Sequence, residues 1–110
     1  MSSLLPPIIR EHLGAIVALA RAYEVERLEV FGSVMTDRFD PERSDVDFLV
    51  QMKERGPLDD FRRYVGLEDG LGTVLGMPFD LVLSDALQRE PFRAEAAKTR
   101  RIIYDAAANS

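Results

Sequence analysis

Two short stretches decide the fold of this chain: residues 31–33 read FGS, and residues 45–50 read DVDFLV. The first stretch ends a run of strand-forming residues at Gly32, where the backbone can turn tightly. The second alternates acidic and apolar side chains, so Asp45 and Asp47 point to the same face of a strand. We therefore expect one strand that leaves through a glycine turn and a second that carries two carboxylates.

The apolar pattern predicts the elements around these two stretches. It predicts helices over residues 7–22 and 58–75 and strands over residues 28–31, 45–50 and 79–83. Because glycine disfavours helix, we expect the second helix to break or end near Gly70. A further helix is expected to begin at Ser84 or Asp85 and to restart after Pro91. This order indicates an α+β fold, a small mixed β-sheet flanked by helices.

Length and composition limit the class of protein. The 110 residues, 46% hydrophobic and 30% charged, predict a single domain over residues 1–110. The formal net charge of -5 disfavours direct binding to nucleic acid. With no cysteine and one histidine, carboxylates are left as the metal ligands. We see no membrane-spanning stretch and no secretion signal, so we expect no membrane association and a cytoplasmic location.

The aspartates of the predicted strands form a candidate metal site. Asp45 and Asp47 are two strand rises apart, about 6.6 Å, and their charges repel unless something compensates. A divalent cation bound by both carboxylates would compensate, and hard oxygen ligands suit Mg²⁺ or Mn²⁺. Asp80 lies inside an otherwise apolar strand, where an unpaired charge is costly. If it lies beside the other two, it completes a site of three carboxylates.

Gly32 and Ser33 form a candidate phosphate-binding turn. A glycine after a strand allows a tight turn, and the N–H groups that follow can face an anion, with the Ser33 hydroxyl as a further donor. A phosphate-binding turn opposite a carboxylate-bound cation is what phosphoryl or nucleotidyl transfer requires, since that chemistry depends on positioning and charge neutralisation. The residues therefore predict attack on a nucleoside triphosphate.

This pattern resembles the minimal nucleotidyltransferases of the DNA polymerase beta superfamily. The resemblance rests on Gly32-Ser33, on Asp45 and Asp47 in one strand, and on Asp80 in a later one, and it covers roughly residues 8–104. It implies a polymerase beta-like fold and a nucleotidyltransferase that uses ATP with two Mg²⁺ ions. Asp45 and Asp47 would bind both metal ions, Asp80 would join the ion that activates the attacking hydroxyl, and Gly32 and Ser33 would hold the triphosphate.

The resemblance also implies a partner. Such nucleotidyltransferases often occur with a HEPN-domain toxin, and the transferase acts as an antitoxin that adenylylates a tyrosine of the toxin, in a possible hetero-oligomer. One departure concerns the residues after Ser33: the family commonly continues with a small residue, Arg and Gly, whereas residues 34–37 read VMTD and the first arginine is Arg38.

Several alternatives stay open at this stage. The strand aspartates could belong to a solvated strand, and Gly32-Ser33 could be an ordinary turn. The chain could be an inactive scaffold that neutralises a toxin by binding it, or an enzyme that acts on a small molecule such as an aminoglycoside. Five basic side chains are expected on solvated helix faces: Arg62, Arg63, Lys98, Arg100 and Arg101.

Overall fold

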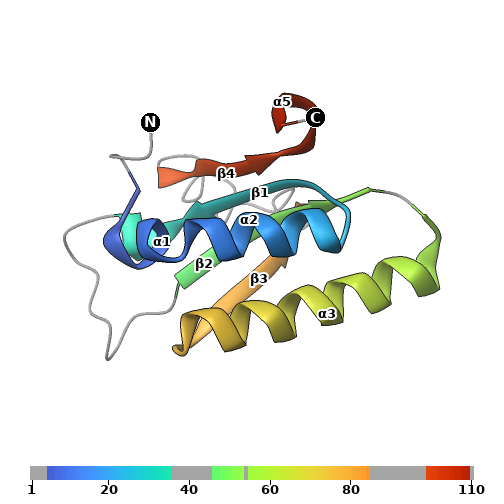
Figure 1. The fold of residues 1–110 in the computed structure, drawn as a ribbon, viewed down its shortest axis with the longest axis horizontal. Coiled ribbons are helices and arrows are strands. Elements are labelled where there is room, and N and C mark those ends of the chain that lie inside the picture. The colour runs from blue at the N-terminus through green and yellow to red at the C-terminus, as the bar shows by residue number, and fades with distance from the viewer. Residues whose placement is uncertain (1–4, 36–45, 54, 85–98, 110) are drawn as a thin grey trace.

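The computed structural model describes residues 5–35, 46–53, 55–84 and 99–109 (Figure 1). In chain order its elements are α1 (Pro7–Glu11), α2 (Leu13–Ala22), β1 (Val25–Phe31), the short 3-10 helix η2 (Gly32–Met35), β2 (Val46–Met52), α3 (Pro57–Leu75), β3 (Phe79–Leu83), β4 (Arg101–Asp105) and α5 (Ala106–Asn109). The helix expected after Ser84 and the strand residue Asp45 lie outside the described residues.

The four strands form one mixed sheet in the order β3-β2-β1-β4. β1 pairs antiparallel with β2 and with β4, whereas β2 and β3 run parallel. Figure 1 shows α2 and α3 side by side in front of this sheet. The expected α+β architecture, a small mixed sheet with helices packed against it, is confirmed.

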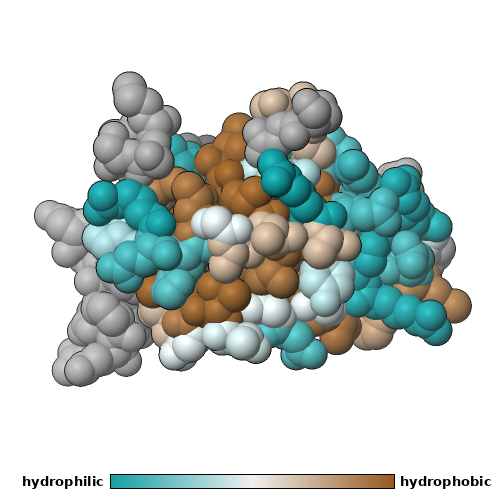
Figure 2. Space-filling model, in the orientation of Figure 1, coloured by the Kyte–Doolittle hydropathy of each residue, from teal (hydrophilic) through white to brown (hydrophobic). Residues whose placement is uncertain are grey.

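The core lies between the sheet and the helices. Alternate strand residues such as Val30, Phe48 and Leu81 are buried on the face toward the helices. From the helices, Ile16 and Leu67 are fully buried in the same cluster. Figure 2 shows hydrophobic residues gathered over the middle of the helical side, with hydrophilic residues toward the end where α3 begins.

The helices differ from the expected ones in two places. The first is divided at His12, which ends α1 and precedes α2, so residues 7–22 form two helices rather than one. α3 runs unbroken through Gly66 and Gly70, and the expected break near Gly70 is wrong. A Cβ at Gly66 would overlap the Tyr23 ring, and one at Gly70 would overlap the Leu19 side chain. These glycines therefore let α3 approach α2 and its end closely, and that packing offsets their poor helix propensity.

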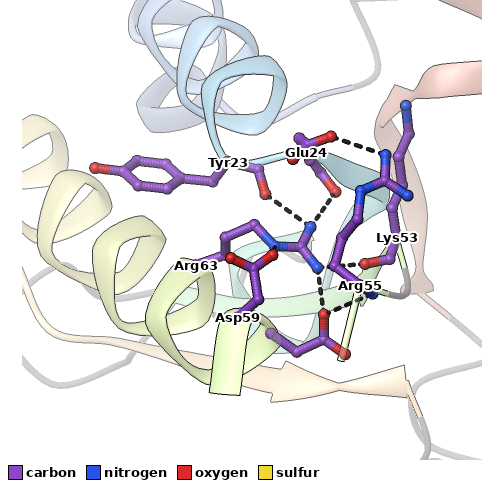
Figure 3. Close-up of polar contacts among 7 residues, drawn as sticks. Tyr23, Glu24, Lys53, Arg55, Asp59 and Arg63 are labelled. Atoms are coloured by element: carbon purple, nitrogen blue, oxygen red, sulfur yellow. Dashed lines mark hydrogen bonds and ion pairs between the residues drawn. The ribbon is translucent and has the colours of Figure 1, made fainter. Parts of the chain in front are cut away.

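Arg63 joins α3 to the end of α2 and to the end of β2 (Figure 3). Its Nη1 donates to the carbonyl oxygens of Tyr23, at 3.3 Å, and Glu24, at 3.0 Å. Its Nη2 donates to the Lys53 carbonyl and to Asp60, and its Nε makes an ion pair with Asp59 at 3.1 Å. The guanidinium thus donates hydrogen bonds to carbonyl groups of two different turns.

Burial of Arg63 corrects the expectation of a solvated side chain, since the residue is only 8% exposed. The turn that it holds is unusual, because Glu24 has a positive φ of 55° without being glycine. Arg55 supports the same turn from outside through an ion pair with the Glu24 carboxylate at 2.9 Å. That carboxylate is exposed, and its hydrogen bond with Arg55 lowers its pKa.

Replacing Arg63 should destabilise the fold far more than replacing its exposed neighbour. Arg63→Ala leaves the carbonyls of the two turns without their buried donor, and we expect a loss of about 3 kcal/mol in the free energy of unfolding. Arg62→Ala removes the same kind of side chain from the solvated side of α3 and should change that free energy by less than about 0.5 kcal/mol. Urea denaturation measures the free energy of unfolding of both variants. Equal stabilities would contradict this account of Arg63.

Candidate active site

One row across three strands brings the functional candidates together. Phe31 of β1 pairs with Asp47 of β2, and Asp47 pairs with Asp80 of the parallel strand β3. Neighbouring strands lie about 4.8 Å apart, so Asp47 and Asp80 are closer in space than two aspartates two residues apart along one strand. Their row belongs to the sheet face that points away from α2 and α3, since the alternate residues Val46 and Phe48 are buried toward the helices.

Gly32 follows Phe31 directly and therefore lies beside Asp47. Its φ of +86° is a conformation that L side chains rarely adopt, and a Cβ built on it would overlap Asp47 Oδ2 and lie 3.3 Å from Asp47 Cγ. Both the backbone turn and the space beside the carboxylate thus require glycine at this position. The sequence-derived association between the glycine turn and the strand aspartate is a direct contact in the fold.

Tyr64 of α3 fixes the strand that carries Asp80. Its hydroxyl donates to the carbonyl oxygen of Leu81, the residue next to Asp80. Burial raises the pKa of the Tyr64 hydroxyl, and the negative charges of Glu68 and Asp80 add to that rise. The Asp80 carboxylate is itself exposed, so it is available to a ligand at the edge of the sheet.

Two interactions on this side of the molecule were missed by the sequence reasoning. The Thr99 hydroxyl accepts a hydrogen bond of 2.8 Å from the Gly32 N–H. Arg100 pairs with Glu29 of β1, with its Nη2 2.7 Å from Glu29 Oε2. Glu29 is only 4% exposed, whereas the Arg100 side chain is 37% exposed, so a buried carboxylate is paired here with a partly exposed arginine. Arg101 begins β4 and Arg100 directly precedes that strand, so neither lies on a helix, which corrects the expectation for both. Lys98 lies outside the described residues.

The described residues fit a divalent cation in donor chemistry but supply only part of a site. Asp47 and Asp80 offer hard carboxylate oxygens from neighbouring strands, where two like charges repel and a cation relieves the repulsion. Asp45 and the Ser33 hydroxyl lie outside what the structure describes. Over the described ranges, no three Asp, Glu, His or Cys side chains come together.

Comparison with known protein families gives a match over most of the chain. The family model for the nucleotidyltransferase domain matches residues 9–104. The chain belongs to the nucleotidyltransferase domain family. A curated relative from Methanocaldococcus jannaschii, named "Putative protein adenylyltransferase MJ0128", is 33% identical over 81 residues, which are 74% of this chain and 76% of the relative. Membership supports the resemblance drawn from Gly32-Ser33 and the strand aspartates.

Solved structures share the nucleotidyltransferase fold at low sequence identity. A toxin-antitoxin structure with AMP-PNP matches with a TM-score of 0.59 at 17% identity, over 88% of this chain and 76% of that chain. A complex of tri-AMPylated Shewanella oneidensis HEPN toxin with MNT antitoxin matches with a TM-score of 0.54 at 16% identity, over 91% of this chain and 75% of that chain. In the part of this chain that the structure describes, no helix is both long and apolar enough to cross a membrane.

A methyl group at Gly32 should disturb the fold and the site together. Gly32→Ala forces a positive φ on an L residue and presses its Cβ against Asp47, so we expect a loss of about 2 kcal/mol in the free energy of unfolding. Gly14→Ala is the matched control, because Gly14 is helical and has open space around it. Gly14→Ala should raise the free energy of unfolding by about 0.5 kcal/mol. Thermal and urea denaturation measure the stability of both variants. A Gly32→Ala variant as stable as the wild type would contradict the contact with Asp47.

Proposed function

We propose that this nucleotidyltransferase is a Mg²⁺-dependent protein adenylyltransferase that moves AMP from ATP to a tyrosine hydroxyl of a partner HEPN-domain toxin and so acts as an antitoxin. The observation that carries the proposal is the row in which Asp47 and Asp80 meet beside Gly32. The name of the Methanocaldococcus jannaschii relative and the toxin-antitoxin assemblies among the structural neighbours support it. Because ATP is the donor, we assign the reaction to the cytoplasm.

The chemistry is the transfer of an adenylyl group. The acceptor oxygen forms a new bond to the α-phosphorus of ATP, the bond from that phosphorus to the bridging oxygen breaks, and pyrophosphate leaves. The hydroxyl proton passes to a neighbouring carboxylate or to water. Mg²⁺, when bound, supplies neutralisation of the phosphate charge and activation of the attacking hydroxyl.

The candidate residues of this chain would have different roles according to their positions. Asp45, Asp47 and Asp80 would hold the metal ions, with Asp80 on the edge strand as the ligand on the acceptor side. Gly32 and Ser33 would hold the triphosphate, because their turn adjoins the Asp47 carboxylate. The acceptor itself would come from the partner.

The proposal predicts AMP transfer that depends on Asp47. Wild-type protein, ATP and Mg²⁺ are incubated with a HEPN-domain partner, and intact mass spectrometry records both chains. We expect the partner to gain the mass of one or more AMP groups. Asp47→Asn should reduce the rate by at least about a hundredfold, since it removes a metal ligand. Asp69→Asn makes the same change on the exposed side of α3 and should transfer AMP at the wild-type rate.

The same variants separate catalysis from simple binding. If Asp47→Asn binds the partner and neutralises it as well as the wild type does, the chain is a binding antitoxin and the enzymatic proposal fails. If neutralisation is lost together with AMP transfer while binding persists, catalysis is the mechanism. Wild-type protein that adds no AMP to the partner would also overturn the proposal.

A further inference from the structure

We propose that Thr99 is a positioning residue that holds the Gly32 peptide in the orientation needed for nucleotide binding. The inference rests on the proposed function. Its direct observation is the 2.8 Å hydrogen bond in which the Gly32 N–H donates to Thr99 Oγ1, across 67 positions of sequence. A side-chain hydroxyl therefore occupies the backbone donor of the residue that begins the proposed phosphate-binding turn.

The sheet explains why Thr99 reaches Gly32. Val30 of β1 pairs with Arg101 of the antiparallel strand β4. Continued by two residues, this register would bring position 99 opposite Gly32. The backbone turns away at Gly32 instead, with a φ of +86°, so no regular ladder bond can form there. The Thr99 hydroxyl takes the place of the missing ladder partner.

A second attachment holds Thr99 in place. The next residue, Arg100, donates through Nε to Glu29 Oε2 at 2.9 Å, and its Nη2 lies 2.7 Å from the same oxygen. Glu29 is buried on β1, three residues before Gly32. Thr99 and Arg100 are therefore tied to β1 at two points, and the hydroxyl cannot drift freely from the Gly32 N–H.

The consequence for the site follows from the position of Gly32. The Gly32 N–H is occupied by Thr99, while its Cα faces the Asp47 carboxylate so closely that no Cβ would fit. The turn is thus hydrogen-bonded on the β4 side and lies close against the Asp47 carboxylate on the β2 side. Loss of the Thr99 acceptor removes the hydrogen bond and lets the turn rotate relative to Asp47. We therefore expect weaker binding of ATP and not merely a smaller folded fraction.

The test compares four proteins in AMP transfer to the HEPN-domain partner at varied concentrations of ATP with Mg²⁺. Thr99→Val keeps the shape of the side chain and removes the acceptor, and it should raise the KM for ATP about tenfold. Thr99→Ser restores the acceptor and should return KM close to the wild-type value. Thr73→Val is the matched control, because the Thr73 hydroxyl is exposed and donates to a carbonyl of its own helix α3, that of Asp69, at 3.2 Å.

The readout separates positioning from stability. A purely structural role lowers the amount of active protein, which changes the apparent maximal rate and leaves KM for ATP unchanged. Thr99→Val with a wild-type KM therefore overturns the inference and leaves the proposed function standing. If the wild type transfers no AMP, the proposed function fails, and the inference is decided by the Kd of ATP with Mg²⁺. A Kd for ATP that is higher in Thr99→Val than in the wild type and close to the wild-type value in Thr99→Ser supports the inference. Equal Kd values in the three proteins, or no binding of ATP, overturn it.

A measurement on the wild type covers the case in which Thr99→Val does not fold. Amide hydrogen exchange followed by NMR should show the Gly32 N–H protected in the wild type and in Thr99→Ser. Exchange of the Gly32 amide at the rate of an unstructured peptide in the wild type would overturn the inference, because the hydrogen bond to Thr99 would then be absent.

Discussion

The register of β2 between β1 and β3 is the constraint on which the site depends. Antiparallel pairing with β1 places Asp47 opposite Phe31 and next to the Gly32 turn, and parallel pairing with β3 places Asp80 on the other side of Asp47. A shift of one residue in either pairing would turn an aspartate toward the helices. The burial of Phe48 on the helical face prevents such a shift, since it would expose that side chain and bury a carboxylate.

The helical layer secures this register from the opposite face. α3 packs close to α2 through its glycines, and Arg63 attaches it to the turn before β1 and to the end of β2. Tyr64, the next residue, bonds the carbonyl of Leu81 in β3. One helix thus fixes the end of β2 and the middle of β3. Thr99 and Arg100 fix the end of β1 that leads into Gly32. The site lies at the end of β1 that Thr99 and Arg100 hold, and Arg63 holds the opposite end of β1 and β2.

The sequence predicted which strands carry Asp47 and Asp80, but it did not predict the contacts between residues far apart in the chain. The alternation around Asp47 and the apolar run around Asp80 sufficed to place both on strands, and β3 has the predicted bounds Phe79–Leu83. Local patterns carry no information on which strands become neighbours, so the meeting of Asp47 with Asp80 depended on a resemblance. Gly70 read as a helix breaker because its packing partner, Leu19, is distant in sequence. For the same reason Arg63 was expected on a solvated helix face and Thr99 was missed, since their partners Glu24 and Gly32 lie 39 and 67 positions away.

We propose that Asp47 and Asp80 hold a divalent cation beside Gly32. This site can be tested by titration with Mn²⁺ alone, followed by paramagnetic broadening of assigned amide signals. We expect broadening that begins at residues 32, 47 and 80 and that is lost in Asp80→Asn. Broadening centred elsewhere on the molecule, or broadening that is unchanged in Asp80→Asn, would contradict it.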